Sequence, residues 1–167
     1  MSSVTNIISE LESLNKIYEE LLSTAQSKKV AIINNDITEL TQLMTRENRL
    51  LKQTEHIEEL RKESLMALLE EKGIRTKLNL NISEVSRLVF DPKERKDLLE
   101  IRDTLVRNTQ QLKKENEIIH QLIEQSMQFI DFSLNILVDT EDELIYQNPA
   151  QHSSQFKKSN QFFDTKA

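Results

Sequence analysis

The sequence reads DPKERKDLLEIRDTLVRNTQQLKKENEIIHQLIEQSMQFIDFSLNILV over residues 91–138. Asp91 is a favourable N-cap, and Pro92 suits the first helical position because its missing N–H would have no helical partner there. Neither Gly nor Pro interrupts the remainder of the stretch. We therefore predict one helix over residues 92–138, about 70 Å long at the rise per residue of an α-helix.

This helix carries two rows of apolar side chains. The first row runs along its whole length and is expected to pack on the rest of the molecule; it contains Leu98, Ile101, Leu105, Leu112, Ile119, Ile123, Met127, Ile130, Leu134 and Leu137. The second row lies about 150° away on the helix and is confined to the C-terminal half; it contains Ile118, Leu122, Phe129, Phe132 and Ile136. Two apolar faces need two sets of neighbours.

Three interpretations of the second row stay open. A helix in a three-helix bundle contacts two neighbours, so the row would be buried within the molecule. However, a helix of about 47 residues beside helices of about 30 and about 36 should extend past them, which leaves the row uncovered. It would then bind an amphipathic partner helix or a second copy of the chain. We favour the partner helix.

Two further long helices are predicted before this one. Over residues 4–33 apolar side chains repeat every seven positions and form a narrow coiled-coil seam, which Lys28 interrupts; the seam contains Val4, Ile7, Leu11, Leu14, Tyr18, Leu21, Ala25 and Ile32. Residues 34–36, Asn-Asn-Asp, favour a reversal of the chain. The second helix is predicted over residues 37–72, with Gly73 as its left-handed C-terminal cap. Its apolar stripe includes Glu47.

The remaining segments are a connector and a tail. Residues 74–90 should hold one short helix that starts near Asn81. Residues 139–167 are polar and lack periodicity, so they are predicted to be disordered when unbound, although Tyr146, Phe156, Phe162 and Phe163 would suit a recognition segment. One Gly in 167 residues argues against a sheet. The predicted fold is all-α: an elongated antiparallel helical bundle or coiled coil of three long helices over residues 1–138, with a short connector helix and a flexible C-terminal tail.

Composition excludes several classes of function. Without Cys the chain has no disulfide and no thiolate site, and His56, His120 and His152 are too far apart in sequence to suggest a metal site. No Gly-rich phosphate loop is present, so we predict no cofactor, no catalytic residues and no enzyme activity. The net charge of −6 gives little reason to expect nucleic acid, and no apolar run approaches the roughly 20 residues that span a membrane. These features indicate a cytoplasmic protein whose partner is another protein, without direct membrane insertion.

The chain resembles the FlgN-type flagellar export chaperones of bacteria. The resemblance in the first two helices rests on Lys29, Asn35, Asp36, Leu40, Glu47, Leu50, Leu51, Leu60 and Arg61. In the last helix it rests on Asn116, Leu122, Ser126, Phe129, Ile130, Leu134 and Leu137. The ending Phe163-Asp164-Thr165-Lys166-Ala167 is similar to the tail of relatives from Gram-positive bacteria, whereas the Gly that commonly follows a tail Tyr is missing after Tyr146.

This resemblance implies a cytosolic helical protein that binds the C-terminal helical segments of the hook–filament junction (hook-associated) proteins. Such a chaperone keeps its clients from assembling prematurely and helps deliver them to the membrane export gate of the type III apparatus. The residues expected to contact the client are Ile118, Leu122, Phe129, Phe132 and Ile136. Tyr146, Phe162 and Phe163 are further candidates, for contact with the client or with the gate protein. The alternative is a structural coiled-coil protein that homodimerises or tethers a partner through the same apolar face.

Overall fold

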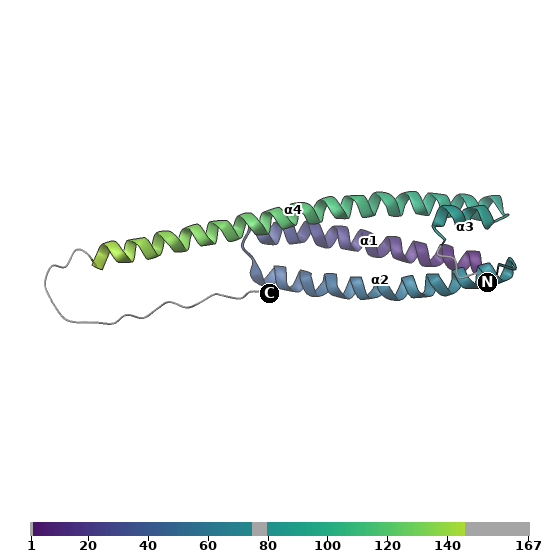
Figure 1. Cartoon of the computed structure of the whole chain (residues 1–167), viewed down its shortest axis with the longest axis horizontal. Coiled ribbons are helices and arrows are strands. Elements are labelled where there is room, and N and C mark those ends of the chain that lie inside the picture. Colours follow the sequence, from purple (N-terminus) through teal and green to yellow (C-terminus); the bar gives the residue numbers. More distant parts are fainter. Residues whose placement is uncertain (1, 75–79, 146–167) are drawn as a thin grey trace. The chain divides into compact units, whose positions relative to one another are not determined.

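The computed structural model describes the backbone of residues 2–74 and 80–145 and the side chains of these residues up to Val138. Four helices make up most of this part of the chain (Figure 1): α1 (Ser3–Ile33), α2 (Ile37–Glu71), α3 (Ile82–Leu88) and α4 (Pro92–Ile145). The described residues contain no strand. The predicted fold class, three long helices with a short connector helix, is confirmed.

Local hydrogen bonds fix where the helices begin. The side chain of Asp36 accepts from the backbone N–H of Glu39 at 2.9 Å and caps α2. Asn81 and Glu84 form a reciprocal capping box at the start of α3, because each side chain accepts from the other residue's backbone N–H. Gly73 has a φ of 72°, the left-handed conformation predicted for the residue after α2.

The last helix is longer than expected. The predicted helix ends near residue 138, whereas α4 continues to Ile145. Residues 139–145 contain neither Gly nor Pro, and Pro149 is the first later residue whose ring would break a helix. The rest of the predicted tail, residues 146–167, lies outside the described residues.

The chain forms two compact units, Met1–Ser126 and Met127–Ala167. Within the first unit α1 and α2 run antiparallel side by side (Figure 1). Two hydrogen bonds show this register: Ser3 Oγ donates to Glu71 Oε1 at 2.5 Å, and Ser64 Oγ donates to Glu10 Oε1 at 2.7 Å. In contrast, α1 and α4 run parallel to each other. Asn15 accepts a hydrogen bond from Asn108 at 2.7 Å, and further along both helices Lys29 forms an ion pair with Glu115.

The apolar core lies along the interior of this first unit. The predicted seam of α1 is buried with the exception of Tyr18, which is half-buried against the core. The largest cluster joins side chains from every helix, namely Val4, Ile7, Leu11, Leu14, Leu65, Leu68, Leu69, Val85, Leu98 and Leu105, together with Val89 after α3. Burial of each large aliphatic side chain contributes about 1.5–3 kcal/mol, so this cluster is the main source of stability.

The two charged interruptions of the apolar stripes pair with each other. Lys28, which breaks the seam of α1, places its Nζ 2.7 Å from Oε2 and 3.0 Å from Oε1 of Glu47, which breaks the stripe of α2. The Lys28 and Glu47 side chains are only 12% and 20% exposed. Because a half-buried charge without a partner is costly, this pair disfavours any shift of α1 against α2.

The core assignment predicts the effect of truncating Leu68, which has no exposed surface. We expect Leu68→Ala to lower the free energy of unfolding by about 2–5 kcal/mol, through lost burial and the cavity left behind. Met66→Ala, two residues away on α2 and 47% exposed, is the control and should cost less than about 1 kcal/mol. Urea unfolding followed by circular dichroism measures both, and equal losses would show that the core is placed wrongly.

The ion pair predicts non-additive effects. Lys28→Met should destabilise the bundle by about 1–3 kcal/mol, because Glu47 would keep its charge at a half-buried site without a partner. The double variant Lys28→Met with Glu47→Leu should recover most of that loss, since two apolar residues would complete the seam. Unfolding free energies of the two single variants and the double variant form the cycle that measures the coupling. Additive effects would mean that the pair does not set the register.

Candidate docking surface

The packing of α4 on the α1–α2 hairpin stops near Leu122. The last buried cluster consists of Ala25 and Ile32 of α1 with Ile119 of α4, and Leu40 and Leu122 pack against it. Leu122 therefore contributes to the packing of the bundle, although the sequence analysis assigned it to the docking face.

Residues 127–138 form an exposed apolar segment within the second unit, and we call it the apolar segment below. Phe129 and Phe132 are 70% and 63% exposed. Every other large apolar side chain of the segment is exposed as well, namely Met127, Ile130, Leu134, Ile136, Leu137 and Val138. The structure thus places three predicted contact residues, Phe129, Phe132 and Ile136, on one exposed stretch.

The exposure extends further around the helix than expected. The first apolar row of α4 was predicted to pack along its whole length on the other two long helices. That prediction holds for Leu98, Leu105 and Ile119, which are buried, but it is wrong from Ile123 onward. Met127, Ile130, Leu134 and Leu137 belong to that row and are exposed.

Few polar groups interrupt the apolar segment. Asp131 is its only charged residue. The hydroxyl of Ser133 donates to the carbonyl oxygen of Phe129 at 2.8 Å, so this polar group is satisfied within the helix. Gln128, Asp131 and Asn135 lie on one side of the helix, whereas the exposed large apolar side chains occupy the other sides. The segment therefore has the pattern of an amphipathic helix whose apolar sides suit contact with another molecule.

The other candidate residues are divided between described and undescribed parts of the chain. Ile118, in the first unit, is 43% exposed. Tyr146, Phe162 and Phe163 lie outside the described residues. His56 and His120 are exposed, and no group of three or more His, Cys, Asp or Glu side chains that could hold a metal ion occurs in the described ranges. Among the described helices none is long and apolar enough to cross a membrane.

The fold and this segment define a class: an all-α protein with three long helices, the longest of which carries an exposed apolar surface. The model of the FlgN protein family matches residues 1–154. The chain therefore belongs to the FlgN family, a family of chaperones rather than enzymes, associated with flagellar proteins. It is also 26% identical over 165 residues to the "Uncharacterized protein YvyG" of Bacillus subtilis (strain 168), and the match covers 99% of each chain. No solved structure matches the chain.

Proposed function

We propose that the protein is a cytosolic flagellar type III export chaperone that binds C-terminal helical segments of hook–filament junction proteins through its apolar segment. Family membership supports the flagellar role, and the exposed segment supports the mode of binding. The observation that carries the proposal is the exposure of Phe129 and Phe132 on a stretch with a single charge. Exposed apolar surface of this kind marks interaction sites in proteins that remain in water.

The mechanism follows from mutual burial of apolar surface. An amphipathic helix of the client would lay its apolar side chains along Phe129 and Phe132, in the helix-in-groove manner. Each large side chain removed from water contributes about 1.5–3 kcal/mol before the cost of ordering the two partners is subtracted. The same contact covers the client surface that would otherwise polymerise. The client would therefore stay unassembled until it is released at the export gate.

The first test is the stoichiometry of the complex. We expect a monomer at micromolar concentration that forms a one-to-one complex with a junction-protein C-terminal fragment, as measured by light scattering after size-exclusion chromatography. A stable homodimer whose mass does not change when the fragment is added would instead support the structural coiled-coil function. In that case a second copy of the chain would cover the apolar segment.

The second test removes the apolar character of the segment. Phe129→Asp with Phe132→Asp should abolish binding of the fragment, because two carboxylates would be buried without partners. Helical content and melting temperature should stay almost unchanged, since both aromatic side chains are more than half exposed.

The matched control places the same charges on exposed apolar residues elsewhere. Phe90 is 86% exposed between α3 and α4, and Met44 is exposed on α2. Phe90→Asp with Met44→Asp should bind the fragment like the unmodified protein. If this control loses binding equally, added negative charge rather than the apolar segment decides the interaction. A large drop in melting temperature of the Phe129 and Phe132 variant would show that the segment belongs to the core.

A further inference from the structure

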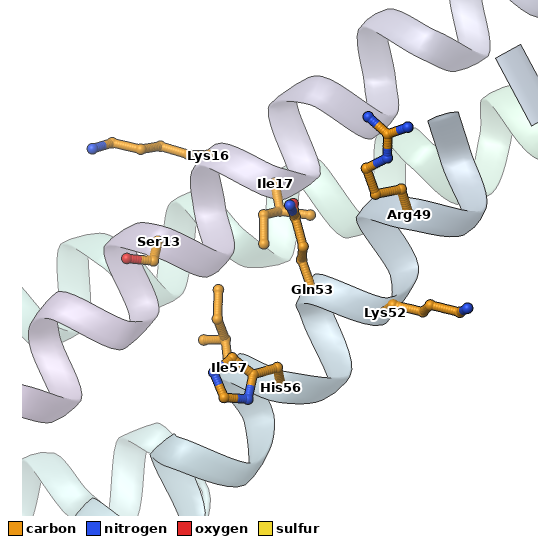
Figure 2. A pocket seen from close by; sticks show the side chains of 8 residues that line it. All are labelled: Ser13, Lys16, Ile17, Arg49, Lys52, Gln53, His56 and Ile57. Carbon is orange, nitrogen blue, oxygen red and sulfur yellow. The ribbon is translucent and has the colours of Figure 1, made fainter. Parts of the chain in front are cut away.

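A shallow depression lies between α1 and α2, in the first unit and on a different part of the chain from the apolar segment. Its volume is about 450 Å³, and it is lined by Ser13, Lys16, Ile17, Arg49, Lys52, Gln53, His56 and Ile57. Ile17 is buried and Ile57 is half-buried, so the floor is aliphatic. Figure 2 shows Ile17, Gln53 and Ile57 between the two helices, with Lys16 and Lys52 extending away from them on opposite sides.

The charge of this depression is opposite to that of the chain. The protein has a net charge of −6, yet Lys16, Arg49 and Lys52 line the depression together with His56, and no acidic residue does. Two other depressions of the described surface are lined mainly by acids: Glu100 and Asp103 with Arg107 in one, and Glu12, Glu19 and Glu100 with Lys16 in the other. The positive character is therefore local, and Lys16 lies at its border with the acidic surface.

The three cations of the depression form no ion pair with any described residue, although other cations of the same two helices do. Glu20, an acid of α1 near the depression, is occupied by Arg46 at 3.4 Å. Arg49 and Lys52 are three residues apart on α2, a spacing at which like charges repel. An incoming acidic group would relieve this repulsion.

An antiparallel helix pair has two grooves, one on each side. In the first unit α4 packs along one side, where Leu112 contacts the cluster of Ile17, Leu21 and Leu50. Figure 2 shows the lining side chains towards the viewer, with α4 behind the two helices. The depression is thus a vacant position in the packing of the hairpin, and a helix is the element that fits such a position.

We propose that this depression binds an acidic amphipathic helical segment of a partner protein. One aliphatic side chain of that segment would rest on Ile17 and Ile57. Its Asp or Glu side chains, one turn away, would reach Lys16, Arg49 and Lys52. This site is separate from the apolar segment, so the protein could hold a client and a second protein at the same time. The inference does not depend on the proposed function.

The test uses a designed probe, a fluorescein-labelled peptide of roughly 15 residues in which Leu repeats at helical spacing between Glu residues. A second peptide carries Lys in place of every Glu. Fluorescence anisotropy should show binding of the acidic peptide and not of the basic one. Lys16→Glu with Lys52→Glu should weaken the binding at least about tenfold.

Two variants separate the site from general electrostatics. Lys93→Glu with Arg95→Glu makes the same change in net charge at exposed residues of α4 and should alter the affinity by less than about twofold. Gln53→Phe keeps the charge and fills the depression, so it should also weaken binding of the acidic peptide. Circular dichroism would confirm that all variants keep their helical content.

Several outcomes would overturn the proposal. They are equal binding of the basic peptide, an equal loss in the Lys93 and Arg95 control, or unchanged binding by Gln53→Phe. Tighter binding of a thymidine oligonucleotide or of phosphatidylserine vesicles would assign the cations to nucleic acid or to a membrane surface instead. The Lys16 and Lys52 variant should still bind the junction-protein fragment, whereas the Phe129 and Phe132 variant should still bind the acidic peptide. The two variants thus show separately whether the proposal for the depression or the proposal for the apolar segment is wrong.

Discussion

The antiparallel packing of α1 on α2 determines where the first unit buries side chains of α4. Near the turn of the hairpin, Ile32 and Leu40 pack in one cluster with Ile119 and Leu122 of α4. The ion pair between Lys28 and Glu47 holds the two hairpin helices in this register. The exposed apolar side chains of residues 127–138 belong to the second unit.

Most of the fold could be predicted from local chemistry. The seven-residue grid of α1, the reversal at residues 34–36 and the left-handed Gly73 each depend on neighbouring residues, and all are present in the structure. Contacts between distant helices depend on the register of one helix against another. The sequence does not determine the path of the connector over residues 74–90, so this register could not be predicted. For this reason Lys28 and Glu47 were recognised as interruptions but not as partners. For the same reason the contact of Leu122 with the cluster of Ala25, Ile32 and Ile119 was not predicted.

The candidate sites differ in how visible they are in the sequence. The aromatic residues of the apolar segment lie within a few positions of one another, so a helical wheel is enough to find Phe129 and Phe132. The basic depression is built from α1 and α2 together, and its residues are separated by more than 30 positions. Neither helix alone shows an unusual excess of positive charge. Only the antiparallel packing of α1 and α2 places Lys16, Arg49 and Lys52 on the lining of one depression.

The two surfaces also call for different kinds of partner. Apolar contact along residues 127–138 is strong but tolerant of sequence, because burial of hydrocarbon has no direction. Charge contacts around Ile17 and Ile57 are weaker, but they distinguish acidic from basic segments and speed up association. A protein that must hold a client and then release it at a fixed place benefits from both properties. Under the two proposals above, the apolar segment supplies affinity for a helical client, and the basic depression supplies discrimination between acidic and basic partner segments.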